Sequence, residues 1–467
     1  CAAATTLLRP LTPAGSTLGF GTMNLTHASS ALLRWLGAVS TVLLPGIATG
    51  QTPSVDAPPD SLSLAAVYVR LHAGTPRIMA ARAAAQAAAE RVGPARRPPD
   101  PELQFALMNR EIPGFGLSDP LGMNQIQLTQ IIPIAGKVGL AADVERARAA
   151  AAAAQADDVL WAERSRAAMA FYELYTADHS IRIMQESQRL LRDLVRTTET
   201  MYAVGDAGQA DVLRAQVELA RMAEELVRMD AMRSSAASRL NAIVDNPVDR
   251  PVPSPMEPRW EGDLPPTDSL VALAITSRPM LLAGAATVRA AGAGERLAGR
   301  EIWPDLEVGL QYGWRPMEDG TEHMVSVMLG LRLPIWAGSR QGSMRREATA
   351  MREMATADLQ AMEAETRGRV SELVAAVARA RRLRTLYRRT VLPQAAATFS
   401  SALAAYRVGG VDFMTLLDAQ MNVNRYHQAA IAATAELGQA IAELEMMTAT
   451  PLLAERDAAG AVPGGAR

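Results

Sequence analysis

The chain has 467 residues, a formal net charge of −2, one cysteine, and a composition that is 49% hydrophobic but only 4% aromatic. The near-neutral charge excludes a general nucleic-acid binder, which needs a basic excess to displace counterions. A single cysteine excludes an internal disulfide framework and a cysteine-rich zinc site. The length suits two or three average domains or one long repetitive architecture.

Residues 23–50 have the features of an export signal. Arg34 precedes an apolar run over residues 35–47, and small residues at positions 48 and 50 precede a cleavage point before Gln51. The run is shorter than the ~20 residues of a membrane-spanning helix, so we expect a cleaved signal peptide. A buried apolar helix is the alternative.

Cys1 has two interpretations. It is the acylated first residue of a mature lipoprotein, or residues 1–22 precede the true start of the protein at Met23. The complete signal downstream favours the second interpretation, so lipidation of Cys1 is the weaker hypothesis. Residues 1–50 are therefore assigned to upstream sequence and signal peptide.

Two motifs recur in the chain at an offset of 204 residues. Residues 202–205 and 406–409 both read Tyr-x-Val-Gly, and residues 212–216 and 416–420 share the pattern Leu-x-Ala-Gln. Self-similarity of this kind predicts an internal duplication. We expect a first repeat at 51–245, a Pro-rich equatorial linker at 246–266, a second repeat at 267–450 and a flexible C-terminal tail at 451–467.

Each repeat has the same predicted order of a helix, two strands and a long helical hairpin. The first helix covers about 60–92 and 267–300. The long tracts Lys137–Ala203 and Ser339–Val408 contain no proline except Pro393, and at 1.5 Å per residue each would extend ~100 Å. Returning helices follow at about 209–244 and 412–449. Helices of this length predict a coiled-coil tube or rod.

Four short segments alternate between apolar and polar residues, which is the period of a strand. They cover about 103–107, 123–131, 306–314 and 325–333. A length of ~9–11 residues fits a tilted membrane-spanning strand. A sheet in lipid must close, and four strands are too few. We therefore expect three copies to supply about twelve strands.

With these motifs, residues 55–450 resemble the TolC-like outer-membrane efflux proteins. The resemblance rests on the duplicated Tyr-x-Val-Gly and Leu-x-Ala-Gln motifs and on the strand exit at residues 130–137. It implies a mainly α fold with a small β part. Long helical hairpins would form an α-barrel, and four transmembrane strands per chain would form a trimeric twelve-stranded barrel.

The resemblance also implies a function. The protein would be a homotrimeric, passive exit duct in the outer membrane, in contact with lipid and extended through the periplasm. It would work with a periplasmic adaptor (a membrane fusion protein) and an inner-membrane RND pump, without cofactor, catalysis or nucleic acid. The Gly136-Lys137 exit resembles the heavy-metal branch of the family. The alternatives are a type I secretion duct of the same fold and a non-channel periplasmic coiled-coil adaptor or structural protein.

The resemblance places a gate at the hairpin tips. Asp418 falls at the position of one gate aspartate, whereas Thr415 occupies the position of the other, which departs from the family pattern. The equivalent residues of the first repeat are Arg214 and Asp211. Rings of Asp211 and Asp418 would favour cations; ordinary solvated charges are the alternative.

The tips are also the implied adaptor-docking surface, and the polar strand faces are the expected barrel lumen. The docking residues are Val204, Gly205, Gly208, Leu213, Gln216, Val408, Gly409, Gly410, Leu417 and Gln420. The lumen residues are Glu307, Gln311 and Arg332. Tyr312, Trp314 and Trp336 belong either to an interfacial aromatic girdle or to packing at the strand ends.

Three further patterns favour structural roles. Methionines at 222, 229 and 232 and at 344, 351 and 354 have spacings of seven and three, which predicts a packed heptad seam rather than a copper path. The five histidines lack a two-ligand spacing on one helix, so we expect no metal site. The arginines between 379 and 389 predict a solvated surface or one that faces an acidic partner.

Overall fold

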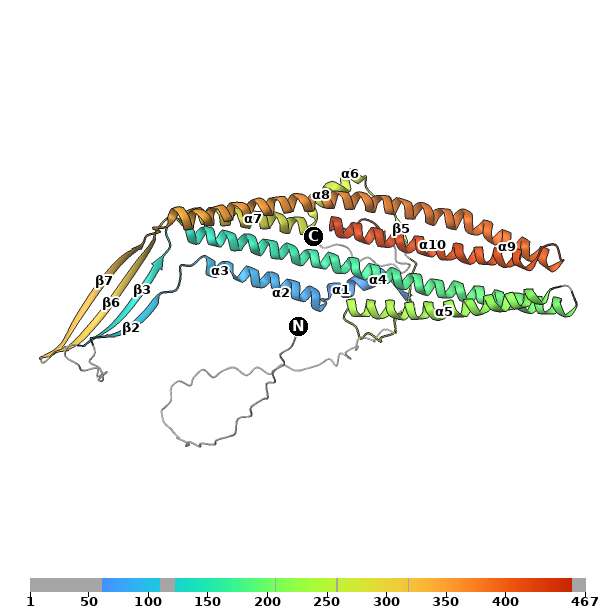
Figure 1. Cartoon of the computed structure of the whole chain (residues 1–467), viewed down its shortest axis with the longest axis horizontal. Coiled ribbons are helices and arrows are strands. Elements are labelled where there is room, and N and C mark those ends of the chain that lie inside the picture. The colour runs from blue at the N-terminus through green and yellow to red at the C-terminus, as the bar shows by residue number, and fades with distance from the viewer. Residues whose placement is uncertain (1–60, 110–121, 206, 258, 318, 456–467) are drawn as a thin grey trace, which may run out of the picture. The chain divides into compact units, whose positions relative to one another are not determined.

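The order of helices and strands in the first half of the chain recurs in the second half (Figure 1). This computed structural model describes residues 61–109, 122–205, 207–257, 259–317 and 319–455. Cys1 and the expected signal peptide lie outside the described residues. Each half contains short helices, two strands of one sheet and a long helical hairpin, as the duplication predicts.

Short helices precede the strands in both halves. They are α1 (Leu64–His72), α2 (Pro76–Glu90) and α3 (Val92–Ala95) in the first half, and α6 (Thr267–Ser277) and α7 (Pro279–Arg300) in the second. The prediction of one continuous helix in each half was wrong. Pro76 and Pro279 lack an N–H and each begins a new helix, while the preceding residues Thr75 and Arg278 are extended.

Proline at these steps also determines how the helices bend. The pair α6 and α7 is bent by 46° at its break. Among the described residues, no single helix is both long and apolar enough to span a membrane, and only this bent pair passes that test of length and composition.

The long helices match their predicted bounds closely. They are α4 (Lys137–Ala203) and α5 (Gln209–Ile243) in the first hairpin, and α8 (Gly342–Leu386), α9 (Leu392–Arg407) and α10 (Phe413–Thr448) in the second. The second tract is interrupted by two π-helical turns, at Ala337–Gln341 and Tyr387–Val391. The second π-turn immediately precedes α9, which has Pro393 in its first turn.

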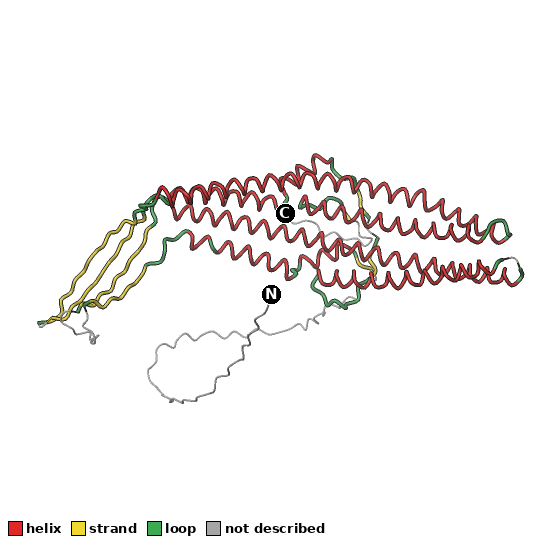
Figure 2. The backbone as a smooth tube through the Cα atoms, in the orientation of Figure 1, coloured by secondary structure: helices red, strands yellow, loops and turns green. Residues whose placement is uncertain are grey.

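The hairpin tips turn on glycine. Gly205 has a φ of 86° and Gly409 a φ of 72°, a left-handed conformation that glycine adopts without a Cβ penalty. The repeated Tyr-x-Val-Gly motif therefore ends the ascending helix in both halves, as Figure 2 shows by the loops between the long helices.

The four strands form one antiparallel sheet. They are β2 (Glu102–Met108), β3 (Met123–Ile132), β6 (Asp305–Met317) and β7 (Gly320–Arg332), paired in the order β2-β3-β6-β7. The predicted alternation is confirmed, because the pairing register places residues of like character on the same face of neighbouring strands. Strands β2 and β7 are the edges of this sheet.

The helices pack side by side in a consistent order. Near the sheet, α4 packs between α2 and α7, and α7 also contacts α8. Toward the tips, α4 contacts α5 on one side and α10 on the other, while α10 also contacts α8 and α9. One buried cluster joins α1, α4, α5 and α10 around Phe171 and Tyr172. A second joins the two hairpins near their tips around Leu191, Tyr406 and Phe413.

The linker between the repeats contributes to two short strand pairs. Strand β4 (Ser254–Pro255) runs parallel to β1 (Ser61–Leu62). Strand β5 (Trp260–Glu261) is antiparallel to β8 (Ala454–Glu455), which lies at the start of the expected C-terminal tail. The linker thus contacts the beginning of the described chain and its end.

Candidate functional site

The tips of the two hairpins lie together and enclose a small pocket. The tip pocket has a volume of about 440 Å³. Its lining includes Asp211 from α5 and Asp412 from the turn before α10. Behind it, the Thr198 hydroxyl lies 3.2 Å from the Tyr406 hydroxyl and connects α4 with α9.

Of the predicted gate residues, Asp211 lines this pocket, and Arg214 and Thr415 contact its two acidic lining residues. Asp211 and Arg214 form an ion pair of 4.0 Å within one turn of α5. Thr415 donates its backbone N–H to Asp412 at 3.0 Å, and its hydroxyl also donates to that carboxylate. Asp418 is exposed one turn further along α10 and forms no ion pair within the described chain. Arg214 thus has its ion-pair partner within its own helix.

Asp412 is the tip residue that the sequence analysis missed. Its carboxylate caps the first turn of α10, a position that favours aspartate. The Thr415 hydroxyl and amide hydrogen bonds, aided by the positive charge of Arg214, lower the pKa of Asp412. The spacing Asp412-x-x-Thr415 before an apolar helix could have identified it as an N-cap.

The predicted docking residues divide into exposed and buried sets. Val204, Leu213 and Val408 are 68%, 54% and 81% exposed. The exposed set also includes Gly205, Gly208, Gln216, Gly409 and Gly410. Leu417 and Gln420 are only 7% and 1% exposed. Their placement on a docking surface is therefore corrected: both pack inside the tip, because α10 turns this face toward the other helices.

The predicted lumen residues share the polar face of the sheet. Glu307 and Gln311 lie two and six residues along β6 from Asp305, which pairs in register with Arg332 of β7. The Gln311 amide donates to the Gln125 side chain on β3. A hollow of about 380 Å³ on this face is lined by Gln127, Thr129, Glu307, Gly309, Met328 and Arg332, among others.

The opposite face of the sheet is apolar and exposed. Leu103, Val327 and Leu329 are 69%, 70% and 75% exposed. Tyr312 packs beside Trp314, with ring centroids 5.8 Å apart, and its hydroxyl lies 2.7 Å from His323 Nδ1. Trp336 lies off the sheet, at the start of the π-turn before α8, and is 67% exposed. An exposed apolar face of this extent marks a surface that needs a covering medium or partner.

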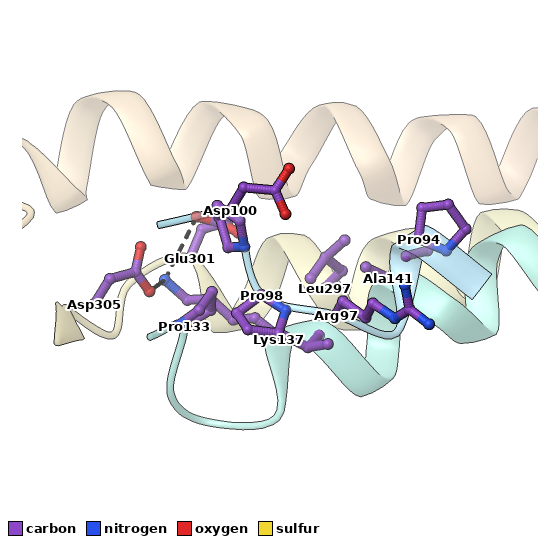
Figure 3. A pocket seen from close by; sticks show the side chains of 13 residues that line it. Pro94, Arg97, Pro98, Asp100, Pro133, Lys137, Ala141, Leu297, Glu301 and Asp305 are labelled. Atoms are coloured by element: carbon purple, nitrogen blue, oxygen red, sulfur yellow. Dashed lines mark hydrogen bonds and ion pairs between the residues drawn. The ribbon is translucent and has the colours of Figure 1, made fainter. Parts of the chain in front are cut away.

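Lys137, the first residue of α4, connects the sheet to the helices (Figure 3). Its ammonium donates to the Trp303 carbonyl and to Asp305 Oδ1, both at 2.8 Å, and lies 3.7 Å from Glu301 Oε2. The side chain is 8% exposed and lines a pocket of about 690 Å³. A buried lysine needs such partners, so it fixes the exit of β3 beside the entry to β6.

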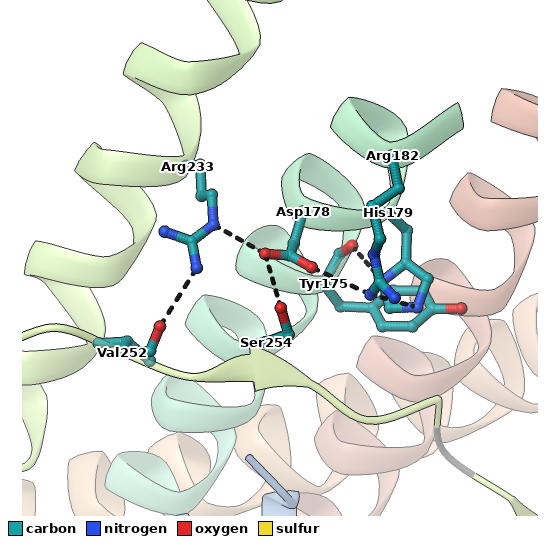
Figure 4. Close-up of polar contacts among 7 residues, drawn as sticks. All are labelled: Tyr175, Asp178, His179, Arg182, Arg233, Val252 and Ser254. Carbon is teal, nitrogen blue, oxygen red and sulfur yellow. Dashed lines mark hydrogen bonds and ion pairs between the residues drawn. The ribbon is translucent and has the colours of Figure 1, made fainter. Parts of the chain in front are cut away.

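A second polar network holds the linker against the first hairpin (Figure 4). Asp178 of α4 accepts hydrogen bonds from Arg233 Nε at 2.7 Å and Ser254 Oγ at 3.3 Å, and pairs with Arg182 at 3.0 Å. Burial alone would raise the pKa of Asp178, but the hydrogen bonds and the two arginines outweigh burial and lower it. Asp178 thereby joins α4, α5 and the linker.

The basic run at 379–389 finds its acidic partners within the same chain. Glu257 of the linker pairs with Arg384 at 3.2 Å and with Arg388 at 2.6 Å, and Asp263 pairs with Arg381 at 2.6 Å. Burial opposes ionisation of Glu257, but the two arginines lower its pKa. The run therefore secures the linker to α8 and to the π-turn that follows it.

The predicted packing of six helical methionines in a heptad seam is wrong for most of them, because they are exposed in the chain. Met222 is buried at 3% exposure, as expected for a packed seam. Met232, Met344, Met351 and Met354 are between 42% and 58% exposed. Within the described ranges, no group of three or more His, Cys, Asp or Glu side chains is arranged to hold a metal ion.

Comparison with known proteins gives a family match and a shared fold. The family model described as outer membrane efflux protein matches residues 67–245 and 270–450. No curated protein sequence matches the chain. Solved structures at low identity support the same fold, and three of them follow.

A membrane protein from Pseudomonas aeruginosa is 19% identical, with a TM-score of 0.72 over 82% of this chain and 93% of that chain. The outer membrane protein VceC from Vibrio cholerae is 17% identical, with a TM-score of 0.69 over 83% and 96%. The MtrE outer membrane channel from Neisseria gonorrhoeae, in its open state, is 14% identical, with a TM-score of 0.69 over 83% and 89%.

Proposed function

The chain belongs to the outer membrane efflux protein family, and on this premise we propose that it is the exit duct of a tripartite export system of the RND type. Members of this family are channels rather than enzymes, and they lie in the outer membrane with a periplasmic extension. The duct would be passive, so the energy for export would come from an inner-membrane pump reached through a periplasmic adaptor.

The four-stranded sheet is the observation that carries the proposal. One face of the sheet is apolar and exposed, and the other is polar. Strands β2 and β7 each have a neighbouring strand on one side only, so the sheet has two open edges. Open edges in hydrocarbon would leave backbone amides unpaired. Pairing β7 of one copy with β2 of the next would remove the edges, and three copies would give about twelve strands, within the range of known barrels. The apolar face would then contact lipid, and Glu307, Gln311 and Arg332 would face the lumen.

The tips are the proposed adaptor-docking surface. Val204 and Val408 follow the tyrosine of each repeated motif and project from the two turns as exposed apolar side chains, and Leu213 adds a third on α5. Exposed apolar residues beside charged ones fit a protein partner. We also propose that the chain belongs to the heavy-metal branch of the family, on the basis of Lys137 and the strand exit that it follows.

The proposed gate consists of the carboxylates near the tip pocket. Asp211 and Asp418, repeated by symmetry, would form rings of negative charge, and Asp412 would add a third ring beside them. Such rings favour cations and slow anions. Arg214 would moderate the charge of Asp211, because the two side chains lie 4.0 Å apart.

Single-channel recording tests the gate. The full-length protein would be reconstituted in planar bilayers with Asp418→Ala and, as a matched control, Asp230→Ala on the exposed shaft of α5. Asp418→Ala is expected to raise conductance and reduce cation preference, whereas Asp230→Ala leaves both unchanged. Equal traces for wild type and Asp418→Ala would remove Asp418 from the gate.

Two alternatives make different predictions. A non-channel periplasmic adaptor would be recovered as a soluble periplasmic protein, whereas the duct would be recovered as heat-resistant trimers in the outer-membrane fraction. A type I secretion duct would share the fold but serve protein export. Gene deletion followed by metal and drug sensitivity assays, together with an assay of secreted proteins, separates these two roles.

A further inference from the structure

The methionines of the sheet are confined to one face. Strands β2, β3, β6 and β7 contain five methionines, and the pairing register places all five on the polar face with Glu307 and Gln311. They are Met108, Met123, Met317, Met324 and Met328. The apolar face consists mainly of leucine, valine, isoleucine and aromatic residues, and within the described strands it carries no methionine. Methionine used only as a hydrophobic side chain would have no reason to avoid that face.

Three of these methionines lie at neighbouring positions on three strands. Met108 of β2 is the register partner of Met123 of β3. The Met123 methyl group lies over Gly313 of β6, where a Cβ atom would overlap it. Met324 of β7 is the register partner of Gly313, and directly opposed side chains lie roughly 5 Å apart at their Cβ atoms. Because Gly313 has no side chain, the Met123 side chain occupies the space between β3 and the position opposite Met324.

A second glycine repeats this arrangement further along the sheet. Met328 is the register partner of Gly309, and a Cβ atom there would lie 3.1 Å from the Met328 methyl carbon. Met324 and Met328 are four residues apart on one strand, a separation of about 13 Å at the rise of an antiparallel strand. The methionine side chains are thus spaced along the strands and do not form a single isolated contact.

The charge and the aromatic content of the polar face indicate which ligand it suits. Its acidic residues are Glu102, Asp305, Glu307 and Glu322, and its basic residues are Arg315 and Arg332. The Lys137 ammonium on Asp305 adds a third positive charge, so the net charge is −1. A cation is therefore favoured over an anion. The rings of Phe105, Tyr312 and Trp314 lie on the opposite face, so this face offers an organic cation no aromatic surface for cation–π binding.

We propose that the polar face of the sheet carries thioether sites for a soft monovalent metal ion, Cu(I) or Ag(I). Met108, Met123 and Met324 form the first site, and Met328 with Met317 extends the series along the strands. Thioethers select such ions over hard cations. Sites without cysteine or histidine would release their ion readily, as conduction requires. This inference rests on the proposed function, in which the polar face lines the duct, and names its substrate class.

Silver binding to the full-length protein tests the site directly. Protein labelled with ¹³C at the methionine methyl groups would be titrated with silver nitrate in chloride-free detergent solution and followed by methyl NMR. The expected result is a saturable shift of the Met108, Met123 and Met324 signals. The exposed helical methionines Met232 and Met351 provide the internal control and should remain in place over the same range.

Leucine variants provide the matched comparison. Met123→Leu with Met324→Leu removes two sulfurs at nearly constant volume, and the shift at Met108 should be lost. Met232→Leu should leave it intact. Equal shifts at all exposed methionines, or none at all, would overturn the proposal. So would an unchanged Met108 titration in the double variant.

Two further measurements separate this inference from the proposed function. Potassium conductance in planar bilayers tests the duct without silver, so a conducting protein that fails to bind silver refutes only the metal site. Silver binding without conductance refutes the duct. Tetraphenylphosphonium serves as an organic cation: if it moves the same three methyl signals and silver does not, the face binds organic cations and the metal proposal is wrong.

Discussion

The two helical hairpins carry the same motif but bury it differently. Leu213 and Gln216 of the first hairpin correspond to Leu417 and Gln420 of the second at the offset of 204 residues. Leu213 is 54% exposed and Gln216 is also exposed, whereas Leu417 and Gln420 are 7% and 1% exposed. The same residue types thus occupy opposite environments in one chain.

The difference follows from the neighbours of each helix. Helix α10 packs against α4, α8 and α9, while α5 has its extensive contact with α4. The motif residues that are buried on α10 are therefore exposed on α5. If copies associate around a common axis, the open face of α5 is the surface on which a neighbouring copy would complete the equivalent packing.

The ends of the corresponding helices differ as well. Asp412 caps α10 through Thr415, whereas Gly208, its equivalent, caps α5 without a side chain. Buried Glu445 accepts the Leu452 N–H after α10, and its equivalent Asn241 donates to the Arg250 carbonyl after α5. At these equivalent positions, both repeats hold the chain that leaves their last helix, the second with a carboxyl group and the first with an amide.

The largest expected effect is at the motif leucine. Leu417→Ala should lower the free energy of unfolding by about 2–5 kcal/mol, because it removes buried methyl groups and leaves a cavity. Leu213→Ala in a single chain should change it by less than about 0.5 kcal/mol, as for an open surface. Denaturant unfolding in detergent measures both. A large loss at Leu213 would show that another copy covers α5, and equal losses in a monomer would break the comparison.

Gly438 should give the next largest effect. A Cβ atom at Gly438 of α10 would overlap the Tyr172 ring of α4, so Gly438→Ala should destabilise the protein by about 1–3 kcal/mol through overpacking. The equivalent residue on α5 is Ser234, which is exposed, and Ser234→Ala should be close to neutral. Melting temperatures of the two variants provide the check, and a stable Gly438→Ala protein would contradict the close packing of α10 on α4.

The N-caps should give a smaller effect of opposite sign in the two hairpins. Asp412→Ala removes the acceptor of the Thr415 N–H and should lower the melting temperature. Gly208→Ser supplies a side-chain cap to α5 and should raise stability by about a few tenths of a kcal/mol. Circular dichroism during thermal unfolding measures both changes. The same sign for the two variants would rule out a capping difference.

Glu445 should change how stability depends on pH. Burial raises the pKa of Glu445, despite the Leu452 amide and Arg164. A carboxyl whose pKa is raised by folding stabilises the fold below its unfolded value near 4.5, and this contribution is lost as pH rises through the folded pKa. Glu445→Gln should therefore gain stability relative to wild type as the pH rises above the unfolded value. A difference independent of pH would argue against a raised pKa.

Local patterns predicted the elements well but not their surroundings. The breaker-free tract Lys137–Ala203 is one helix with the expected ends, and the period-2 segments are the four strands. Pro76 and Pro279 could have predicted the breaks in the short helices from the missing N–H alone. The exposure of Met351 and Met354 could not be read from spacing, because a heptad pattern has the same form whether or not a helix covers it.

The site residues divide in the same way. The resemblance placed Thr415 and Asp418 at the tip, and the repeat added their equivalents Asp211 and Arg214. Asp412 carried a capping pattern that sequence could have revealed. The partners of the arginines at 381, 384 and 388 lie 118 to 131 residues away. Periodicity spans a few residues, so it contained no information on these pairs.

The sequence by itself determined the duplication, the lengths of the helices, the glycine turns and the alternation of the strands, because each depends on residues near one another in the chain. Tertiary structure alone decided that Leu417 is buried and Leu213 open, that the linker receives the arginines of α8, and that five methionines share the polar face. These outcomes depend on which distant elements pack together, and repeated sequence does not create repeated surroundings.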